Sequence, residues 1–132
     1  MLYGTHRHTI DAKGRLFVPA KFRAELGERF FVSIGSGCLI AFLDDEWWRL
    51  EAKLSTNNDL AAFASEFFSM TEQCEPDAQG RVLIPQNLRE YAGLKKDVVF
   101  AGKSRRAQIW DAERWDARKP KDFASVLEGL GL

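Results

Sequence analysis

A nine-residue motif that occurs twice places the strongest constraint on how this chain can fold. The first copy, residues 11–19, reads DAKGRLFVP, and the second copy, residues 77–85, reads DAQGRVLIP. The same spacing of 66 residues continues downstream, where Arg23 matches Arg89. Self-similarity at a fixed spacing indicates one structural unit that the chain uses twice.

Each copy of the motif predicts a tight turn between two strands, followed by a helix. An aspartate side chain accepts hydrogen bonds from backbone N–H groups two residues on, and glycine adopts positive φ without a steric penalty. Asp11 and Gly14 therefore predict the first turn, and Asp77 and Gly80 predict the second. The proline at the end of each motif suits the first position of a helix.

A hairpin and a further helix are expected after each of these short helices. Asp44 and Asp111 occupy matching positions before the further helices, so both are expected to act as N-caps. A middle helix is predicted near residues 60–68, with Asp59 as a possible cap. The four tryptophans are interpreted as core or interface packing: Trp47, Trp48, Trp110 and Trp115. After Pro120, apolar residues at helical spacing predict a short tail helix.

One copy of this unit is too small to bury a core of its own. Two copies can lay their sheets together and share one core. The predicted fold is therefore mainly β with short helices, of the α+β class. It is expected to be a pseudo-two-fold body that presents its two Asp-x-x-Gly-Arg turns in related positions.

The charge of the chain is balanced overall but unevenly distributed. The 19 basic and 19 acidic residues give a formal net charge of zero. Residues 1–23, however, carry five basic residues against the single acidic Asp11, whereas residues 24–76 are strongly acidic. Local patches set the field that a polyanion meets. The first copy of the motif is therefore the more basic of the two.

The sequence offers no set of residues typical of an enzyme or of a metal site. No Ser/His/Asp arrangement and no glycine-rich phosphate loop is present, so neither catalysis, a cofactor nor a small-molecule substrate is expected. Cys38 and Cys74 lack zinc-ligand spacing, and His6 and His8 share one strand face without a third ligand. The loop around Lys103, Arg105 and Arg106 is interpreted as a solvated hairpin end, with a DNA contact as the alternative. No signal peptide or membrane segment is predicted, so a cytoplasmic location is expected.

Nearly the whole chain resembles the MraZ family. The resemblance rests on residues 8–16 and 19–23 in the first half, and on residues 74–81, 88–94 and 108–110 in the second. It implies two SpoVT–AbrB-like swapped-hairpin domains in a double β-barrel, at residues 5–48 and 76–119. A helical connection at 49–75 and a tail at 120–132 complete this division. One departure is that the middle helix has Ala61 and Ser65 where the family usually has arginines.

The resemblance also implies a function and a set of partners. Members of the family are bacterial transcriptional regulators at the head of the division and cell-wall gene cluster. They associate into rings, bind short direct repeats of double-stranded DNA in their own promoter and typically repress it. For this chain we accordingly expect a nucleoid-associated repressor that forms a ring homo-oligomer.

The arginine of the repeated motif contacts DNA in that family, and this role carries over to Arg15 and Arg81. The alternative is that each arginine only bonds the aspartate of its own turn. Lys13 and Arg7 match the neutral Gln79 and Gln73 of the second copy. We therefore hypothesise that the first copy, with Arg15, Lys13 and Arg7, supplies most of the DNA contacts.

Overall fold

The two halves of the chain follow one order of elements in the computed structural model, which describes residues 1–119 and 121–132. The first half consists of β1 (Thr5–Thr9), β2 (Arg15–Phe17), α1 (Ala20–Leu26), β3 (Phe30–Ile34), β4 (Leu39–Phe42) and α2 (Asp44–Ser55). The second half consists of β5 (Glu72–Cys74), β6 (Arg81–Leu83), α4 (Gln86–Ala92), β7 (Asp97–Gly102), β8 (Arg106–Asp111) and α5 (Ala112–Asp116). Between them lie the 3-10 turn η1 (Asn58–Leu60) and α3 (Ala61–Ser69), and α6 (Ala124–Gly129) follows the second half.

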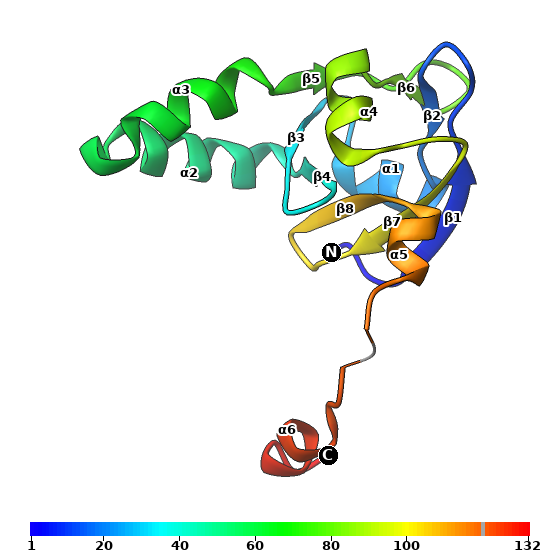
Figure 1. Cartoon of the computed structure of the whole chain (residues 1–132), viewed down its shortest axis with the longest axis vertical. Helices are drawn as coiled ribbons and strands as arrows, with labels where there is room; N and C mark the ends of the chain where they lie inside the picture. Colours follow the sequence, from blue (N-terminus) through cyan, green and yellow to red (C-terminus); the bar gives the residue numbers. More distant parts are fainter. Residues whose placement is uncertain (120) are drawn as a thin grey trace.

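The strands of the two halves interleave in one antiparallel sheet. Its order is β1-β7-β8-β4-β3-β5, and β2 pairs with β6 in a second, two-stranded sheet (Figure 1). The outer strand of each half therefore pairs with the other half: Thr5 lies opposite Ala101 at one edge, and Cys74 lies opposite Phe30 at the other. If each strand is replaced by its counterpart in the other half, the same order results, read from the opposite edge of the sheet. The prediction of an α+β fold built from two related halves is confirmed.

Both halves contribute to one hydrophobic core, as the small size of each unit predicts. Leu16 and Phe22 from the first half and Ile84, Leu88 and Phe100 from the second are almost completely buried in it. The rings of Phe22 and Phe100 meet edge to face, with 6.0 Å between their centroids. This shared core fixes the positions of the two repeated turns relative to each other.

The helices α2 and α3 form an arm that projects from the sheets (Figure 1). A second apolar cluster holds the arm against β3 and β4, and Trp47 is at its centre. The Trp47 ring stacks on Phe31 and on Phe67, at centroid distances of 4.9 and 5.9 Å. The interpretation of Trp47 as a core residue is confirmed, whereas the neighbouring Trp48 is 53% exposed.

The helix caps agree with the sequence prediction at one position and differ at two. The Asp111 side chain accepts a hydrogen bond from the backbone N–H of Arg114, which caps α5 as expected. The prediction for Asp44 was wrong, because Leu43 occupies the N-cap position of α2. Leu43 packs on the shared core, so the chain turns into the helix one residue earlier. Asp59 lies inside η1, where Asn57 provides the cap instead.

The tail helix α6 is present at the predicted place, although Pro120 itself lies outside the described residues. Figure 1 shows it apart from the sheets. Among the described residues, no helix is long and apolar enough to cross a membrane.

Candidate nucleic-acid interface

The two-stranded sheet brings the two repeated turns side by side. In its antiparallel register, Arg15 lies opposite Leu83 and Phe17 lies opposite Arg81. The central pair, Leu16 and Val82, is buried in the core. Because side chains alternate along a strand, the other four side chains share the outer face of the sheet. Both motif arginines therefore lie on one small surface.

Each turn is held by the carboxylate of its aspartate. The Asp11 carboxylate accepts hydrogen bonds from the backbone N–H groups of Lys13 and Arg15, both at 2.9 Å, and from Nε of Arg15 at 2.6 Å. Asp77 accepts the equivalent bonds from Gln79 N, Arg81 N and Arg81 Nε, at 2.9, 2.9 and 3.1 Å. The two copies of the motif thus repeat the same three hydrogen bonds.

These bonds lower the pKa of both carboxyl groups. For Asp11, the backbone N–H of Arg15 is the largest cause, followed by the Arg15 guanidinium and the N–H of Lys13. For Asp77, the backbone N–H of Arg81 is again the largest cause. All of these donors stabilise the charged form of the carboxyl group.

The fold should lose stability in acid through these two groups. Each folded-state pKa lies below the unfolded value of about 3.9, so each carboxylate stabilises the fold above that value and ceases to do so as the pH falls through the folded pKa. We expect the free energy of unfolding, measured by urea denaturation, to fall between about pH 5 and about pH 2. The double variant D11N/D77N should show a shallower fall. The control Asp59→Asn, which removes a carboxylate without an ion pair in the described part of the chain, should keep the wild-type slope. Identical slopes for all three proteins would contradict the assignment.

Each turn is also bound to the opposite half of the protein. The backbone N–H of Val18 donates to the carbonyl of Gly80 at 2.9 Å, and that of Ile84 donates to the carbonyl of Gly14 at 2.8 Å. Both glycines have positive φ, of +85° at Gly14 and +81° at Gly80. The position of one turn therefore depends on the strand of the other copy.

Two arginines of the short helices pass over these glycines. A Cβ atom on Gly14 would lie 2.9 Å from the guanidinium of Arg89, and one on Gly80 would collide with the guanidinium of Arg23. Arg89 Nε donates to the carbonyl of Ile84 at 2.9 Å, and Arg23 lies over the ring of Phe17 at 5.4 Å. Neither arginine was predicted from the sequence to be part of the site. The signal was present in the repeat, which matches Arg23 with Arg89.

The other basic residues of the first copy have different surroundings. The Lys13 side chain is exposed and makes no ion pair among the residues that the structure describes. Arg7, on β1, forms an ion pair with Asp116 of α5 at 2.6 Å, and this contact lowers the pKa of the Asp116 carboxyl. Arg7 is thus restrained by the second half of the chain, whereas Lys13 is not.

A shallow hollow lies beside the outer face of the two-stranded sheet. It is lined by His8, Thr9, Asp11, Arg15, Phe17 and Arg81. The His8 ring lies 5.1 Å from that of Phe17, and partial burial, together with the nearby His6, lowers the pKa of His8. His6 and His8 do point to one side of β1, as expected, and His6 packs edge-on against Phe22.

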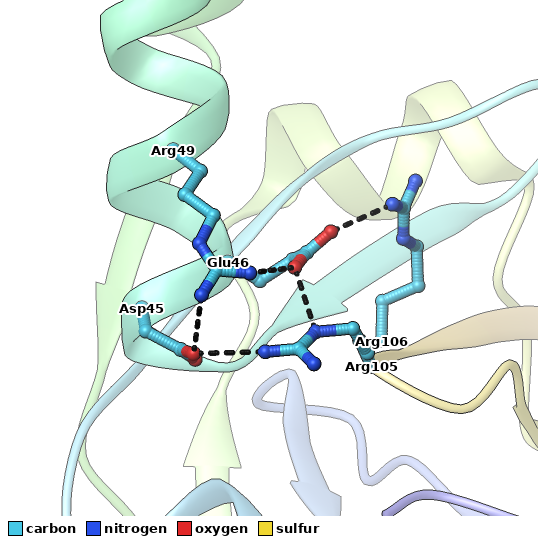
Figure 2. Close-up of polar contacts among 5 residues, drawn as sticks. All are labelled: Asp45, Glu46, Arg49, Arg105 and Arg106. Carbon is cyan, nitrogen blue, oxygen red and sulfur yellow. Dashed lines mark hydrogen bonds and ion pairs between the residues drawn. The ribbon is translucent and has the colours of Figure 1, made fainter.

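Arg105 of the β7–β8 loop and Arg106 at the start of β8 point toward the arm. Arg105 contacts Asp45 and Glu46, both at 3.1 Å, and Arg106 contacts Glu46 at 2.9 Å (Figure 2). Arg49 lies on the other side of the same two carboxylates. The interpretation of a solvated hairpin end holds in part: Arg105 and Arg106 are 40% and 45% exposed, and both also pair with the acidic first turn of α2, which was not predicted.

The histidines, cysteines and carboxylates do not gather into a metal centre. No group of three or more such residues is suitably placed in the described ranges, residues 1–119 and 121–132. Cys38 and Cys74 are both buried, and burial raises the thiol pKa to about 11 and about 12, respectively. Both side chains are therefore protonated thiols at neutral pH.

Comparisons with known proteins agree with this doubled architecture. A family model described as "MraZ protein, putative antitoxin-like" matches the chain twice, at residues 1–66 and 67–125. A protein named transcriptional regulator MraZ from Acetivibrio thermocellus is 49% identical, over 89% of this chain and 85% of the relative. Proteins of the same name from Pelotomaculum thermopropionicum and Ligilactobacillus salivarius are 48% and 49% identical, over 97% and 98% of this chain and 92% and 96% of the relatives.

The fold and its paired turns define a tandem protein in which two copies of one β-rich unit exchange their outer strands. The matched relatives carry the name of a regulator rather than of an enzyme. With about half of its residues identical to theirs and with the family model matched twice, the chain belongs to the MraZ family.

Proposed function

We propose that this protein is a DNA-binding transcriptional regulator and that the outer face of the β2–β6 sheet reads the DNA. The observation that carries the proposal is the pairing of two Asp-x-x-Gly-Arg turns on one rigid surface. The names of the matched relatives support it. The domain boundaries at residues 5–48 and 76–119, the DNA-binding residues and a cytoplasmic, nucleoid-associated location remain predictions.

The geometry of Arg15 suits contact with a nucleic acid. Its Nε is bound to Asp11, which fixes the direction of the guanidinium, while its two terminal nitrogens make no hydrogen bond within the described residues. A guanidinium presented in this way can donate to a phosphate, or to O6 and N7 of guanine in the major groove. The aspartate therefore orients the arginine, so that the two roles considered for Arg15 are compatible.

The neighbouring side chains add further contacts of known chemistry. Phe17 and Leu83 are exposed beside the arginines and are suited to apolar contact with thymine methyl groups. Lys13 supplies charge for the phosphates, and so does Arg7 of β1 once its ion pair with Asp116 is released. Arg81 repeats the geometry of Arg15 but has the neutral Gln79 in place of Lys13. We therefore assign the larger share of DNA affinity to the first copy.

The proposal includes an assembly. Copies of the chain associate into a ring, and adjacent copies present Arg15 to successive short direct repeats in the promoter of the protein's own division and cell-wall gene cluster. Linked weak contacts of this kind bind well together because each additional contact occurs at high effective concentration. Binding at the promoter represses transcription.

We expect Arg15 to contribute more than Arg81 to the affinity for DNA. Removal of one guanidinium contact costs about 1–3 kcal/mol, so Arg15→Ala should lower the affinity for the upstream DNA by about 10- to 100-fold, and Arg81→Ala by less than about fivefold. The measurement is a salt-titrated binding isotherm on the upstream DNA of the chain's own gene, with random DNA of equal length as the comparison. The wild type should prefer the upstream DNA and lose affinity steeply with salt.

Two outcomes would contradict parts of this proposal separately. Equal losses from the two alanine variants would remove the asymmetry between the copies. No preference for the upstream DNA over random DNA would remove the regulator function itself. Both variants must keep the mass of the wild-type assembly, because a change in mass would by itself lower the affinity.

A further inference from the structure

The last helix of the chain carries an apolar face that stays largely exposed in the described part of the structure. Phe123, Val126, Leu127 and Leu130 fall on one side of α6, and they are 60%, 63%, 42% and 69% exposed. None of them belongs to either hydrophobic cluster. A helix this short is only marginally stable in water unless it packs on another surface. Its exposed apolar face therefore indicates a binding partner.

The charge of this segment limits what the partner can be. From Asp122 to Leu132 the charged side chains are Asp122 and Glu128, and the segment has no basic residue. Nucleic acid and an anionic membrane are poor partners for such a segment, because like charges repel. The matching surface has an apolar floor and a cationic rim.

A groove at the base of the arm has that character. Its floor contains the partly buried Leu50 of α2 above Phe42 of β4, which is 1% exposed, and its rim contains Arg49, Lys53 and Arg106 together with Arg105. The guanidinium of Arg106 lies over the ring of Phe42, 6.0 Å from its centroid. Figure 2 shows the three arginines of this rim, with Arg49 coming from α2, Arg105 from the β7–β8 loop and Arg106 from the start of β8.

The groove has a net positive charge, because its cationic side chains outnumber the carboxylates with which they pair. The carboxylates of Asp45 and Glu46 are shared among three arginines, and Lys53 makes no ion pair in the described part of the chain. Four cationic side chains therefore face two carboxylates. The Glu46 side chain is only 16% exposed, so the cationic side chains dominate the surface of the groove.

We propose that the tail of one copy docks in this groove on a second copy. The apolar face of α6 packs on Leu50, while Glu128 and Asp122 of the tail pair with Lys53 and Arg106 of the neighbour. This inference rests on the self-association proposed above and names the segment and the surface that produce it. The helix α6 lies apart from the sheets of its own chain, a position that suits contact with another molecule (Figure 1).

A charge placed on the docking face tests the contact without risk to the fold. Val126 is 63% exposed in the single chain, so Val126→Asp leaves both hydrophobic clusters intact. Because the aspartate would have to be desolvated in the groove, we expect the self-association constant, measured by sedimentation velocity over a dilution series, to fall by at least about tenfold. Ser125→Asp, on the opposite side of α6, is the matched control and should keep the wild-type constant.

An exchange of charges then tests the partner surface. Lys53→Glu and Glu128→Lys should each weaken self-association by about two- to fivefold, and the double variant should recover most of the loss, because a surface ion pair contributes about 0.2–1 kcal/mol. A cross-link fixes the direction. Chains with Leu50→Cys, mixed with chains carrying Val126→Cys, should form a disulfide between the two kinds of chain, since Cys38 and Cys74 are buried.

The possible failures are distinguishable from one another. Unchanged self-association in Val126→Asp, or a disulfide that forms only when both cysteines are on one chain, would overturn the docking of one copy on another. A loss of DNA affinity in Lys53→Glu at unchanged self-association would show that the groove serves DNA instead and would also overturn it. Loss of DNA binding in Arg15→Ala at unchanged mass would leave the docking intact, because that variant tests the proposed function alone.

Discussion

Replacement of Trp47 by alanine is expected to destabilise the protein by about 3–5 kcal/mol, because it removes a large ring from a packed cluster. The ring is 4% exposed and lies between Phe31 and Phe42 of the sheet and Phe67 of the arm. The loss should be concentrated in the arm, because the Trp47 ring stacks both on Phe31 of β3 and on Phe67 of α3. Hydrogen exchange should accelerate in α3 much more than in β7, which lies in the other cluster.

The adjacent tryptophan provides the control for this experiment. Trp48 is 53% exposed and meets Phe31 only at its edge, at a centroid distance of 5.6 Å. Trp48→Ala should therefore cost less than about 1 kcal/mol. Similar losses for the two variants would show that the arm is not held by the buried ring.

The second large effect is expected at the first turn. Gly14→Ala should cost about 3 kcal/mol, since alanine is strained at a φ of +85° and its Cβ would also lie 2.9 Å from the Ile84 carbonyl oxygen and the Arg89 guanidinium. Gly27→Ala separates the two causes, because Gly27 has a similar φ of +79° but no atom within 4 Å of the added Cβ. It should cost only the backbone penalty of about 1–3 kcal/mol for a φ of +79° with a ψ of −165°.

Chemical denaturation of both glycine variants provides the measurement. The difference between their free energies of unfolding reports the steric part of the effect, which joins the first turn to the second half. Equal losses would mean that the close approach of Arg89 and Ile84 contributes nothing. Because Gly14 precedes Arg15, the same substitution should also weaken DNA binding if the proposed interface is correct.

The repeat made the order of elements predictable, but not how the strands pair. The side chains of β1 are polar, charged or histidine, so no apolar pattern distinguishes β3 of its own half from β7 of the other half as its pairing partner. The buried face of a strand specifies its register and its pairing partner. For β1, the same face would be buried whether it paired with β3 or with β7. The sequence therefore predicted a shared core without showing that the outer strands are exchanged.

Side-chain contacts between distant segments were the other part that sequence reasoning missed. Arg7 and Asp116 are 109 residues apart, and Arg105 and Glu46 are 59 apart. Neither pair has a helical or strand spacing that would indicate a contact. The aspartate–arginine bonds within each turn were considered in advance because their partners are only four residues apart.

The exchange of outer strands has a consequence for the folding of the protein during its synthesis on the ribosome. The partner of β1 is β7, so that Thr5 waits for Ala101 to be synthesised before it can pair. At about 5–20 residues per second, the amino-terminal strand stays unpaired for roughly 5–20 s after it has been made. Its polar, charged and histidine side chains keep this waiting strand soluble. The sequence of β1 therefore meets two requirements: the strand must stay soluble in the nascent chain, and it must pair with β7 in the folded sheet.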